Sequence, residues 1–585
     1  MNCTRIYTLF LSLCIAWLPA IAQPSVMMQA MKDELSRSMN ELRLGELEQP
    51  YFVSYTVQEV TTIGATASLG GLSRSGESAS RTLHVEVRVG DRDLDNTNFY
   101  SLPDFTSLED ISFGPALLPL EDDYEELRRA IWLATDRAYK DALERIAKKR
   151  AVLQNETVVE KTPDFSIEDP YKHEGGPALP VAEADPIRSL TTDMSAVFRE
   201  HPDIHISSVD ARARHVRVQY VNSEGSSFIR DDPTAMVTVM AGTRADDGTE
   251  ISDSFTAFGR IWADLPGLDE LAEQGQALAG RLEDLRQAMV FERYAGPVLF
   301  EGQAAAELVR QVLVPRLLVQ KAPITDDQRT RRVGDRLTNP FQDKLGSRVL
   351  PRFLAIMDNP ALRENEQGPL WGGYAVDDEG VPARETVLVQ RGMLKTLLAT
   401  RNPIEGIPQS NGHMRAGGPA PSNLLLTSSI GLTAEEMTEE FLALLEEREL
   451  EYGIVVRRLQ EPGAGQFQAR RGGRSRGGRL IRAVVAVKVF PDGREELIRE
   501  AVLTGLSESS FRDIVAASEA LTNHTILFRH SSPSFGPFGF AMPSRRSGIM
   551  ASLVVPSLLF EDVSVRRPPG NIPRPPVVAK PVSGK

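Results

Sequence analysis

The amino-acid sequence predicts an α+β protein with an N-terminal α/β unit, a central helix-bearing unit and a β-rich C-terminal domain. Three patterns lead to this prediction. Apolar residues recur every three or four positions over 122–150, as on one face of a long helix. Apolar and polar residues alternate over 51–57 and 82–89, as in half-buried strands. The apolar run 483–490 precedes Pro491-Asp492-Gly493, which is typical of a hairpin turn.

The N-terminal unit is expected to span 23–190. It should begin with a helix over 26–43, where Met and Leu recur at helical spacing. Residues 64–80 are rich in Gly and Ser, which predicts a mobile hairpin tip between the first two strands. Residues 157–187 contain several Pro, Gly and acidic residues, and we expect a linker there.

The central unit is expected to span 191–336. It contains two predicted strands, His215–Val221 and Ala235–Ala241, and a long predicted helix over 267–292.

The C-terminal domain is expected to span 337–565 and to consist mostly of strands. The return strand of its hairpin should reach Leu503, a helix should lie near 509–521, and a last strand should cover Ser557–Val565. Residues 566–585 form a Pro-rich tail that should be extended and unpacked.

Charge and composition exclude several classes of protein. The chain has 66 Lys and Arg against 80 Asp and Glu, a formal charge of −14, which argues against nucleic acid as the main partner. Apolar residues make up 41% of the chain, and no second apolar run of spanning length follows the N-terminus. A wholly disordered chain and a many-spanning membrane protein are therefore excluded.

The first 22 residues have the parts of a secretory signal peptide. Arg5 precedes an apolar run, Ile6–Ile21, which ends in Ala20-Ile21-Ala22. We expect cleavage after Ala22 and a periplasmic or secreted protein, with an uncleaved membrane anchor as the competing interpretation. Cys3 and Cys14 are the two cysteines of the chain, so cleavage would leave no disulfide, no thiol nucleophile and no cysteine ligand.

Two sequence patterns, one around a serine and one rich in arginine, do not indicate a catalytic or an RNA-binding site. Gly473–Gly477 matches G-x-S-x-G, but a polar Gly-rich segment precedes it and a strand follows, so it is not a nucleophile elbow. The arginines of Arg470–Arg482 favour a solvated loop over an RNA-binding segment.

The spacing of the histidines gives only weak evidence for a zinc site. His201, His205 and His215 could form a site, but Pro202 removes the helical geometry that the first pair would need. Surface or partly buried structural histidines are the preferred interpretation.

A run of carboxylates, Asp377-Asp378-Glu379, precedes Gly380. It could supply an acid and base pair, but neighbouring residues of an extended chain point to opposite faces. A polar turn whose carboxylates accept backbone N–H bonds is the preferred interpretation.

Several segments in a fixed order resemble the TldD/PmbA (TldE) family of metallopeptidase-related proteins. One is Ser410-Asn411-Gly412-His413-Met414-Arg415. The others are Val221–Gly225, Phe353–Pro360, Gly372–Arg384, Thr386–Leu398, Pro421–Leu424 and Ala551–Val563. The likeness covers most of 26–565.

The resemblance implies that a metal site of the family is degenerate here. In the metal-binding type, a helix carries H-E-x-x-x-H and a late cysteine completes the site. The resemblance places Arg310 at the first histidine, Gln311 at the glutamate and Pro315 at the second histidine. Arginine stays charged, glutamine is no base and proline has no side-chain donor atom. We therefore expect no metal and no cofactor at this place.

The resemblance also implies a partner and a ligand. In the family, a metal-free PmbA-type chain pairs with a metal-bearing TldD-type chain to enclose a cleft for unfolded peptide, so we expect a homo- or hetero-dimer. Candidates for lining the cleft lie in two loops: Asp378, Glu379, Gly380, Gly412, His413 and Arg415. Two alternatives stay open: a stand-alone peptide-binding or structural envelope protein, and a peptidase that uses another metal site.

Restoring the two histidines should not restore peptidase activity. The double variant Arg310→His with Pro315→His still lacks the glutamate base, because Gln311 remains, and it lacks the cysteine ligand. We expect peptide hydrolysis by this variant to stay at the level of the unaltered protein, measured with added zinc. Recovered hydrolysis would contradict the assignment of the degenerate motif.

Overall fold

The computed structural model describes most of the chain. The described residues are 25–100, 116–155, 162–176, 179, 182–322, 324–326, 339–461, 481–530, 534–535, 541–542 and 548–568. The predicted signal peptide, residues 569–585 of the Pro-rich tail and almost all of the Arg/Gly-rich loop lie outside them. At Arg566 the expectation of an unpacked tail is wrong, because this residue pairs with Val502 in a sheet. No helix within these ranges has the length and apolar character that crossing a membrane requires.

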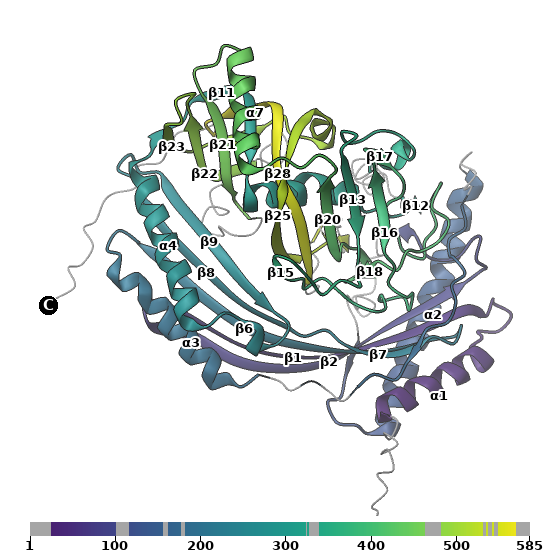
Figure 1. Ribbon diagram of the computed structural model, residues 1–585. Helices are drawn as coiled ribbons and strands as arrows, with labels where there is room; N and C mark the ends of the chain where they lie inside the picture. Colours follow the sequence, from purple (N-terminus) through teal and green to yellow (C-terminus); the bar gives the residue numbers. More distant parts are fainter. Residues whose placement is uncertain are drawn as a thin grey trace, which may run out of the picture.

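The first half of the chain forms one long curved sheet, above whose concave side the second half sits (Figure 1). In the described residues this sheet has eight strands: β1 (Pro50–Ser68), β2 (Gly71–Val89), β4 (Ala116–Leu118), β5 (Lys172–His173), β6 (Ile206–Asn222), β7 (Ser227–Asp231), β8 (Thr234–Arg244) and β9 (Glu250–Gly259). Strand β1 pairs antiparallel with β2 on one side and β6 on the other. The sheet therefore crosses the expected boundary at 190/191, and both predicted units contribute strands to it.

Two pairs of helices cover the sheet. They are α1 (Val26–Glu41) with α2 (Tyr124–Asn155) at one end, and α3 (Ala184–Ala196) with α4 (Leu268–Gln287) at the other. The apolar stripe expected on α2 is buried against β2, with Leu127 and Ile131 fully enclosed. On α4, Leu271, Leu278 and Leu282 pack with the strands around β8. The helices predicted over 26–43, 122–150 and 267–292 are confirmed.

The β-rich domain has a second sheet of twelve described strands. Its principal path is β10 (Met289–Val290), β23 (Glu495–Arg499), β22 (Ile481–Val489), β21 (Gly453–Leu459), β11 (Arg293–Phe300), β28 (Ile549–Arg566), β20 (Asn423–Ser428), β13 (Leu354–Asp358), β16 (Thr386–Gln390) and β17 (Met393–Leu394). Two more strands, β24 (Val502–Thr504) and β25 (Ile514–Phe528), pair with β28. Because β11 belongs to this sheet, the domain begins before the expected residue 337.

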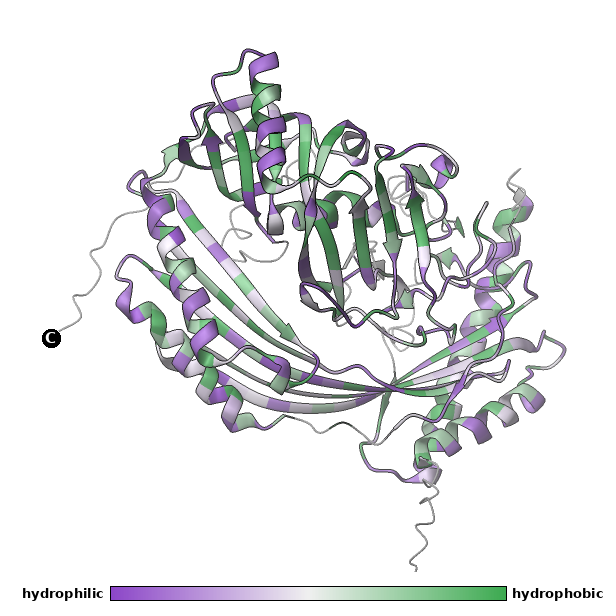
Figure 2. Ribbon diagram, viewed as in Figure 1, coloured by the Kyte–Doolittle hydropathy of each residue, from purple (hydrophilic) through white to green (hydrophobic). Residues whose placement is uncertain are grey.

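Short elements complete the described chain. Helix α7 (Ala434–Glu447) packs on the sheet through Met437, Phe441 and Leu445. Four two-stranded ribbons remain: β3 (Phe99–Tyr100) with β12 (Ile324–Thr325), β14 (Glu364–Asn365) with β15 (Gly368–Pro369), β18 (Met414–Arg415) with β19 (Gly418–Pro419), and β26 (Ser534–Phe535) with β27 (Ala541–Met542). Figure 2 shows hydrophobic residues along the strands of the C-terminal domain, where the largest core lies.

The expected mobile tip at 64–80 is wrong. Strands β1 and β2 continue to Ser68 and Gly71, and only Leu69 and Gly70 turn between them. Both turn residues have positive φ, 49° and 72°, as a tight two-residue hairpin turn requires. Strand β6 pairs with β1 as far as Ala67, so the Gly/Ser-rich segment takes its order from a neighbour distant in sequence.

The helix expected near 509–521 is also wrong. A 3-10 turn covers Glu508–Asp513, and β25 begins at Ile514. Strand β25 pairs with β28 over most of its length. This pairing stabilises the β-branched residues of the segment in a strand more than a short helix would. The predicted hairpin at 483–503 is confirmed, although its return strand is broken at Glu500, whose φ is 63°.

The core of the C-terminal domain should be sensitive to truncation at Phe560. This side chain on β28 is fully buried, with its ring centroid 5.3 Å from that of Phe300 and 5.5 Å from that of Phe511. We expect Phe560→Ala to lower the free energy of unfolding by about 3–5 kcal/mol, measured by urea unfolding. Val387→Ala, at a position 41% exposed on β16, should change it by less than about 1 kcal/mol. Equal effects of the two variants would contradict this assignment of the core.

Candidate functional site

The helix expected to carry the degenerate metal motif lies in the C-terminal core, beside β21 and β28. It begins as α5 (Gly302–Leu308), continues as a π turn over Val309–Leu313 and ends in a 3-10 turn over Val314–Arg316. Pro315 lies in the last turn, where its missing N–H interrupts the helical hydrogen bonds.

Glu307 is a fully buried carboxylate on this helix, and two of the three residues at the motif positions bind it. Arg310 Nη1 donates to Glu307 Oε1 at 2.7 Å, and Gln311 Nε2 donates to Glu307 Oε2 at 3.0 Å. Burial alone would raise the pKa of Glu307, but the hydrogen bond with His524 and the charge of Arg310 outweigh it and hold this pKa below its usual value. The charge of Arg310 therefore neutralises a buried anion, and Gln311 adds a hydrogen bond to it.

His524 and Glu461 complete this cluster from two other segments. His524 Nε2, on β25, lies 2.9 Å from Glu307 Oε1. Glu461 follows β21, and its carboxylate belongs to a group with Glu307 and His524 whose ligand atoms all lie within 4.8 Å of one another. Burial raises the pKa of Glu461, and the nearby charge of Glu307 adds to this effect.

The residues at the motif positions do not fit a metal ion. Arg310 and Gln311 present N–H donors, and Pro315 presents no donor atom to a cation. Among the described residues, the only group of three metal-ligating side chains is Glu307 with Glu461 and His524. A cation there would have to displace the guanidinium of Arg310 from Glu307 Oε1, against charge repulsion.

The three histidines considered from the sequence lie elsewhere and apart from that group. His201 Nδ1 is 2.9 Å from Glu283 Oε1, and His215 Nε2 is 3.0 Å from Asp231 Oδ1. Their side chains are 21% and 12% exposed, which confirms these two as partly buried histidines that pair with separate carboxylates. Within the described ranges, neither they nor His205 join a group of three ligands.

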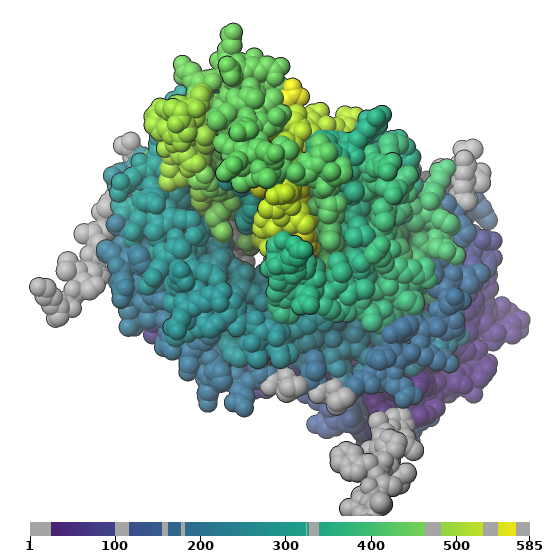
Figure 3. Space-filling model, in the orientation of Figure 1, coloured from purple at the N-terminus to yellow at the C-terminus, as the bar shows by residue number. Residues whose placement is uncertain are grey.

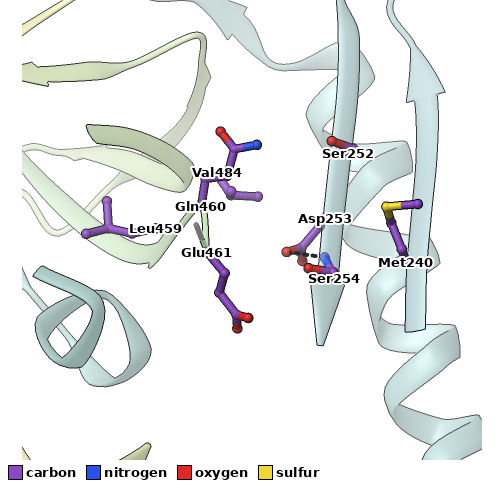
Figure 4. A pocket seen from close by; sticks show the side chains of 8 residues that line it. All are labelled: Met240, Ser252, Asp253, Ser254, Leu459, Gln460, Glu461 and Val484. Atoms are coloured by element: carbon purple, nitrogen blue, oxygen red, sulfur yellow. Dashed lines mark hydrogen bonds between the residues drawn. The ribbon is translucent and has the colours of Figure 1, made fainter. Parts of the chain in front are cut away.

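A pocket opens beside Glu461, between the curved sheet and the C-terminal domain. It is a small, partly open hollow, and its walls come from β8 and β9 on one side and from β21 and β22 on the other (Figure 4). The lining residues are Met240, Ser252, Asp253, Ser254, Leu459, Gln460, Glu461 and Val484. Figure 3 shows the hollow where the two halves of the chain meet.

Asp253 in this pocket is neutralised by two arginines, whereas Glu461 has no such pair among the described residues. Arg281 Nη2 lies 2.9 Å from Asp253 Oδ2, and Arg458 Nε lies 3.2 Å from the same oxygen. Arg458 Nη2 also donates to the carbonyl of Ser254 at 2.8 Å. These bonds tie β9 to β21 and set the width of the pocket.

The acidic run at 377–379 forms a turn. Asp377 is fully buried and accepts N–H bonds from Glu379 and Val381 at 2.9 Å and from Met414 at 3.1 Å. The interpretation as a polar turn is therefore confirmed for Asp377. Burial raises the pKa of Asp377 to about 6 and that of the half-buried Glu379 to about 8, and each carboxylate disfavours ionisation of a neighbouring one.

Asp378 and Arg415 join the C-terminal domain to β7 of the curved sheet. Arg230 Nη2 lies 2.6 Å from Asp378 Oδ1 and 2.9 Å from Asp232 Oδ2. Arg415 Nη2 lies 3.1 Å from that same Asp232 oxygen, and its Nε lies 3.5 Å from Asp378 Oδ1. Two arginines and two aspartates thus form an alternating quartet across the interface.

The remaining cleft candidates are packed tightly. Gly380 has a φ of 81°, and a Cβ there would lie 3.1 Å from the ring of Tyr220. Gly412 has a φ of 76°, and a Cβ there would lie 2.3 Å from the Pro382 carbonyl oxygen. His413 is fully buried, with Nε2 2.9 Å from Asp358 Oδ1. Four of the six candidates, Asp378, Glu379, Gly380 and Arg415, contact the curved sheet, whereas Gly412 and His413 pack within the C-terminal domain. Contact of any of the six with a peptide stays a prediction.

Glu461 and His524 were not among the residues predicted from the sequence, and Glu307 had no predicted role. Glu307 carried a usable signal, because it is the single charged residue within the apolar stretch 304–309, and buried charges in such stretches need partners. Glu461 and His524 carried no such sequence signal, since β25 and the end of β21 meet α5 only in the folded chain.

Comparisons with known proteins agree with this architecture. Residues 293–567 match the model of the PmbA/TldA metallopeptidase C-terminal domain. A stretch of 61 residues is 38% identical to Metalloprotease MJ0996 of Methanocaldococcus jannaschii, covering 10% of this chain and 12% of that protein. The crystal structure of TldE from Thermococcus kodakarensis superposes with a TM-score of 0.57 at 16% identity, over 92% of this chain and 99% of that one. This likeness shows a shared fold.

Neutralising Glu379 should remove part of the pH dependence of stability. Its pKa is about 8 in the folded protein against about 4.5 when unfolded, so the folded state keeps a proton that the unfolded state loses. The stability from this proton is full below pH 4.5 and is lost as pH rises towards 8. We expect Glu379→Gln to reduce the fall in unfolding free energy between pH 5 and 8.5 by roughly 2 kcal/mol, allowing for partial exposure, measured by urea unfolding.

Glu439→Gln, at an exposed position on α7, is the matched control and should leave the pH profile unchanged. An identical profile for Glu379→Gln and the unaltered protein would show that Glu379 ionises normally in the folded state.

Proposed function

Because the chain belongs to the TldD/PmbA family of metallopeptidase-related proteins, we propose that it is an exported, metal-free subunit of PmbA type. In this proposal it forms a peptide-binding cleft together with a metal-bearing chain of the same family. Export rests on the predicted signal peptide, Ala22 being the expected last residue removed.

One observation carries the metal-free assignment. Arg310 and Gln311, at the positions of the first histidine and the glutamate, both donate hydrogen bonds to the buried Glu307. A guanidinium held against a buried carboxylate supplies the positive charge that a metal ion would otherwise supply. The chain thus has a structural reason to be stable without metal at this place.

Strand β9 supports the peptide-binding part of the proposal. Within the part of the chain that the structure describes, β9 pairs with β8 on one side and with no strand on the other. The pocket lies along this edge, with Asp253 and Ser254 on β9 across from Glu461 (Figure 4). Arg458 occupies the Ser254 carbonyl there, so the part of the edge open to a peptide begins beyond Ser254. An extended peptide can add to such an edge through backbone hydrogen bonds that are largely independent of its sequence.

A second candidate function is a peptidase that uses a metal held by Glu307, Glu461 and His524. Their ligand atoms lie close enough together to hold one ion. This candidate is weaker, because Glu307 already binds Arg310 and Gln311.

Metal content separates the two candidates. The protein should be purified from its native envelope fraction without added metal, and its bound zinc per chain should be measured by elemental mass spectrometry. We expect well under one zinc per chain, and we expect an H-E-x-x-x-H relative to co-purify. About one zinc per chain, lost in His524→Ala and kept in His201→Ala, would overturn the proposal in favour of the second candidate. A metal-free chain without any such relative in the organism would favour a stand-alone peptide-binding or structural protein.

A further inference from the structure

Two arginines meet at Gly373, next to the end of β9. Arg260 directly follows β9, and its Nη2 donates to the carbonyl of Gly373 at 2.6 Å. The guanidinium of Arg363 packs on the same glycine, because a Cβ there would lie only 1.7 Å from Arg363 Nη1. Only glycine leaves room for this approach, so two positive charges are brought to one peptide unit.

Neither arginine is neutralised by a carboxylate. Arg363 Nη1 donates to the carbonyls of Pro360 at 2.8 Å and Leu362 at 3.1 Å. Among the residues that the structure describes, neither Arg260 nor Arg363 forms an ion pair with Asp or Glu, although the chain as a whole is acidic. Backbone carbonyls orient both guanidinium groups without cancelling their charge.

Two neighbouring acids are already paired. Asp232 and Asp378 are shared by Arg230 and Arg415, so this quartet has no net charge to offer. A third, Asp264, accepts the backbone N–H groups of Arg260 and Ile261. Burial and the positive charges of Arg363 and Arg415 outweigh Asp232 and Asp264 and lower the pKa of Arg260. An anion between Arg260 and Arg363 would relieve this repulsion.

We propose that Arg260 and Arg363 bind a carboxylate group of the peptide that pairs with the free edge of β9. The inference rests on the proposed peptide-binding function. A guanidinium pair presents N–H donors in the fork geometry that matches a carboxylate. The carboxylate belongs to the C-terminus of the peptide or to an Asp or Glu side chain.

The position of Arg260 at the end of β9 sets the distance between the carboxylate site and the pocket. Ser254, at the pocket, and Arg260 are six positions apart, which corresponds to roughly 20 Å of extended chain at about 3.3 Å per residue. At the pocket end of the edge, the charges of Asp253 and Glu461 are balanced by Arg281 and Arg458, whereas Arg260 and Arg363 make the other end basic. A bound peptide of about seven residues would therefore place its carboxylate at the arginines and not at the pocket.

The test uses three fluorescent unfolded heptapeptides of one sequence and the full protein. The first has a free C-terminus, the second a C-terminal amide, and the third an amide with one Glu in its last position. We expect the first or the third to bind at least about tenfold more tightly than the second, because charge-assisted hydrogen bonds are lost with the carboxylate. The peptide that binds identifies the source of the carboxylate.

Variants connect this difference to the two arginines. Arg363→Ala should abolish the preference, Arg260→Ala should do the same, and Arg260→Lys should keep part of it because the charge remains. Arg494→Ala, an exposed arginine of the β22–β23 turn, is the matched control and should keep the preference. Arg363 is exposed and bonds only to carbonyls of its own loop, so its variant tests the proposal even if Arg260→Ala folds poorly.

A second readout separates failure of this inference from failure of the proposed function. The thermal unfolding midpoint is measured in acetate and in chloride at equal ionic strength, where a bound carboxylate stabilises the folded state. Acetate stabilisation that Arg363→Ala removes, without any peptide binding, would keep the carboxylate site and overturn the peptide-binding function. Equal binding of all three peptides, unchanged by Arg363→Ala, would overturn the carboxylate site and leave the function standing. Absence of both effects would overturn both.

Discussion

The alternating quartet of Arg230, Asp232, Asp378 and Arg415 holds the C-terminal domain on the curved sheet, and the geometry of the site depends on it. Its members come from the β7 region, the acidic turn and β18, so it forms only when both halves of the chain are in place. Removing one member would leave a charge at least partly buried and unpaired, which is costly, and this cost makes the junction specific. With the junction set, β9 lies opposite β21, and the pocket between them follows.

A second buried charge, that of Glu307, explains the side chains found next to it on the motif helix. Glu307 lies on the motif helix with no exposed surface, and a buried carboxylate must be paired or protonated. Arg310, Gln311 and His524 provide the pairing. Arg310 and Gln311 therefore act together on Glu307: the arginine supplies the opposite charge, and the glutamine adds a hydrogen bond.

Much of the fold was predictable from local pattern. The stripe of α2 and the valine-rich strand β22 each carry their own periodicity, and both were predicted. The two errors share one cause. Residues 64–80 and 509–521 have weak local preferences, and long-range pairing of β1 with β6 and of β25 with β28 decided their structure. The six cleft candidates were found through family likeness, but His524 and Glu461 were not, because only the folded chain brings them to Glu307.

Residue chemistry alone determined what the motif helix is unable to do, since Arg310 stays charged, Gln311 is no base and Pro315 has no side-chain donor atom wherever they lie. It also determined the helices and strands with strong periodicity. Tertiary structure decided which charges are paired and which are in excess. Glu307 and Arg310 neutralise one another, whereas Arg260 and Arg363 meet at Gly373 with no carboxylate between them among the described residues. The physical reason is that charge compensation depends on distance in space and not on distance along the chain. His524 and Glu307, for example, are hydrogen-bonded although they lie 217 residues apart in sequence.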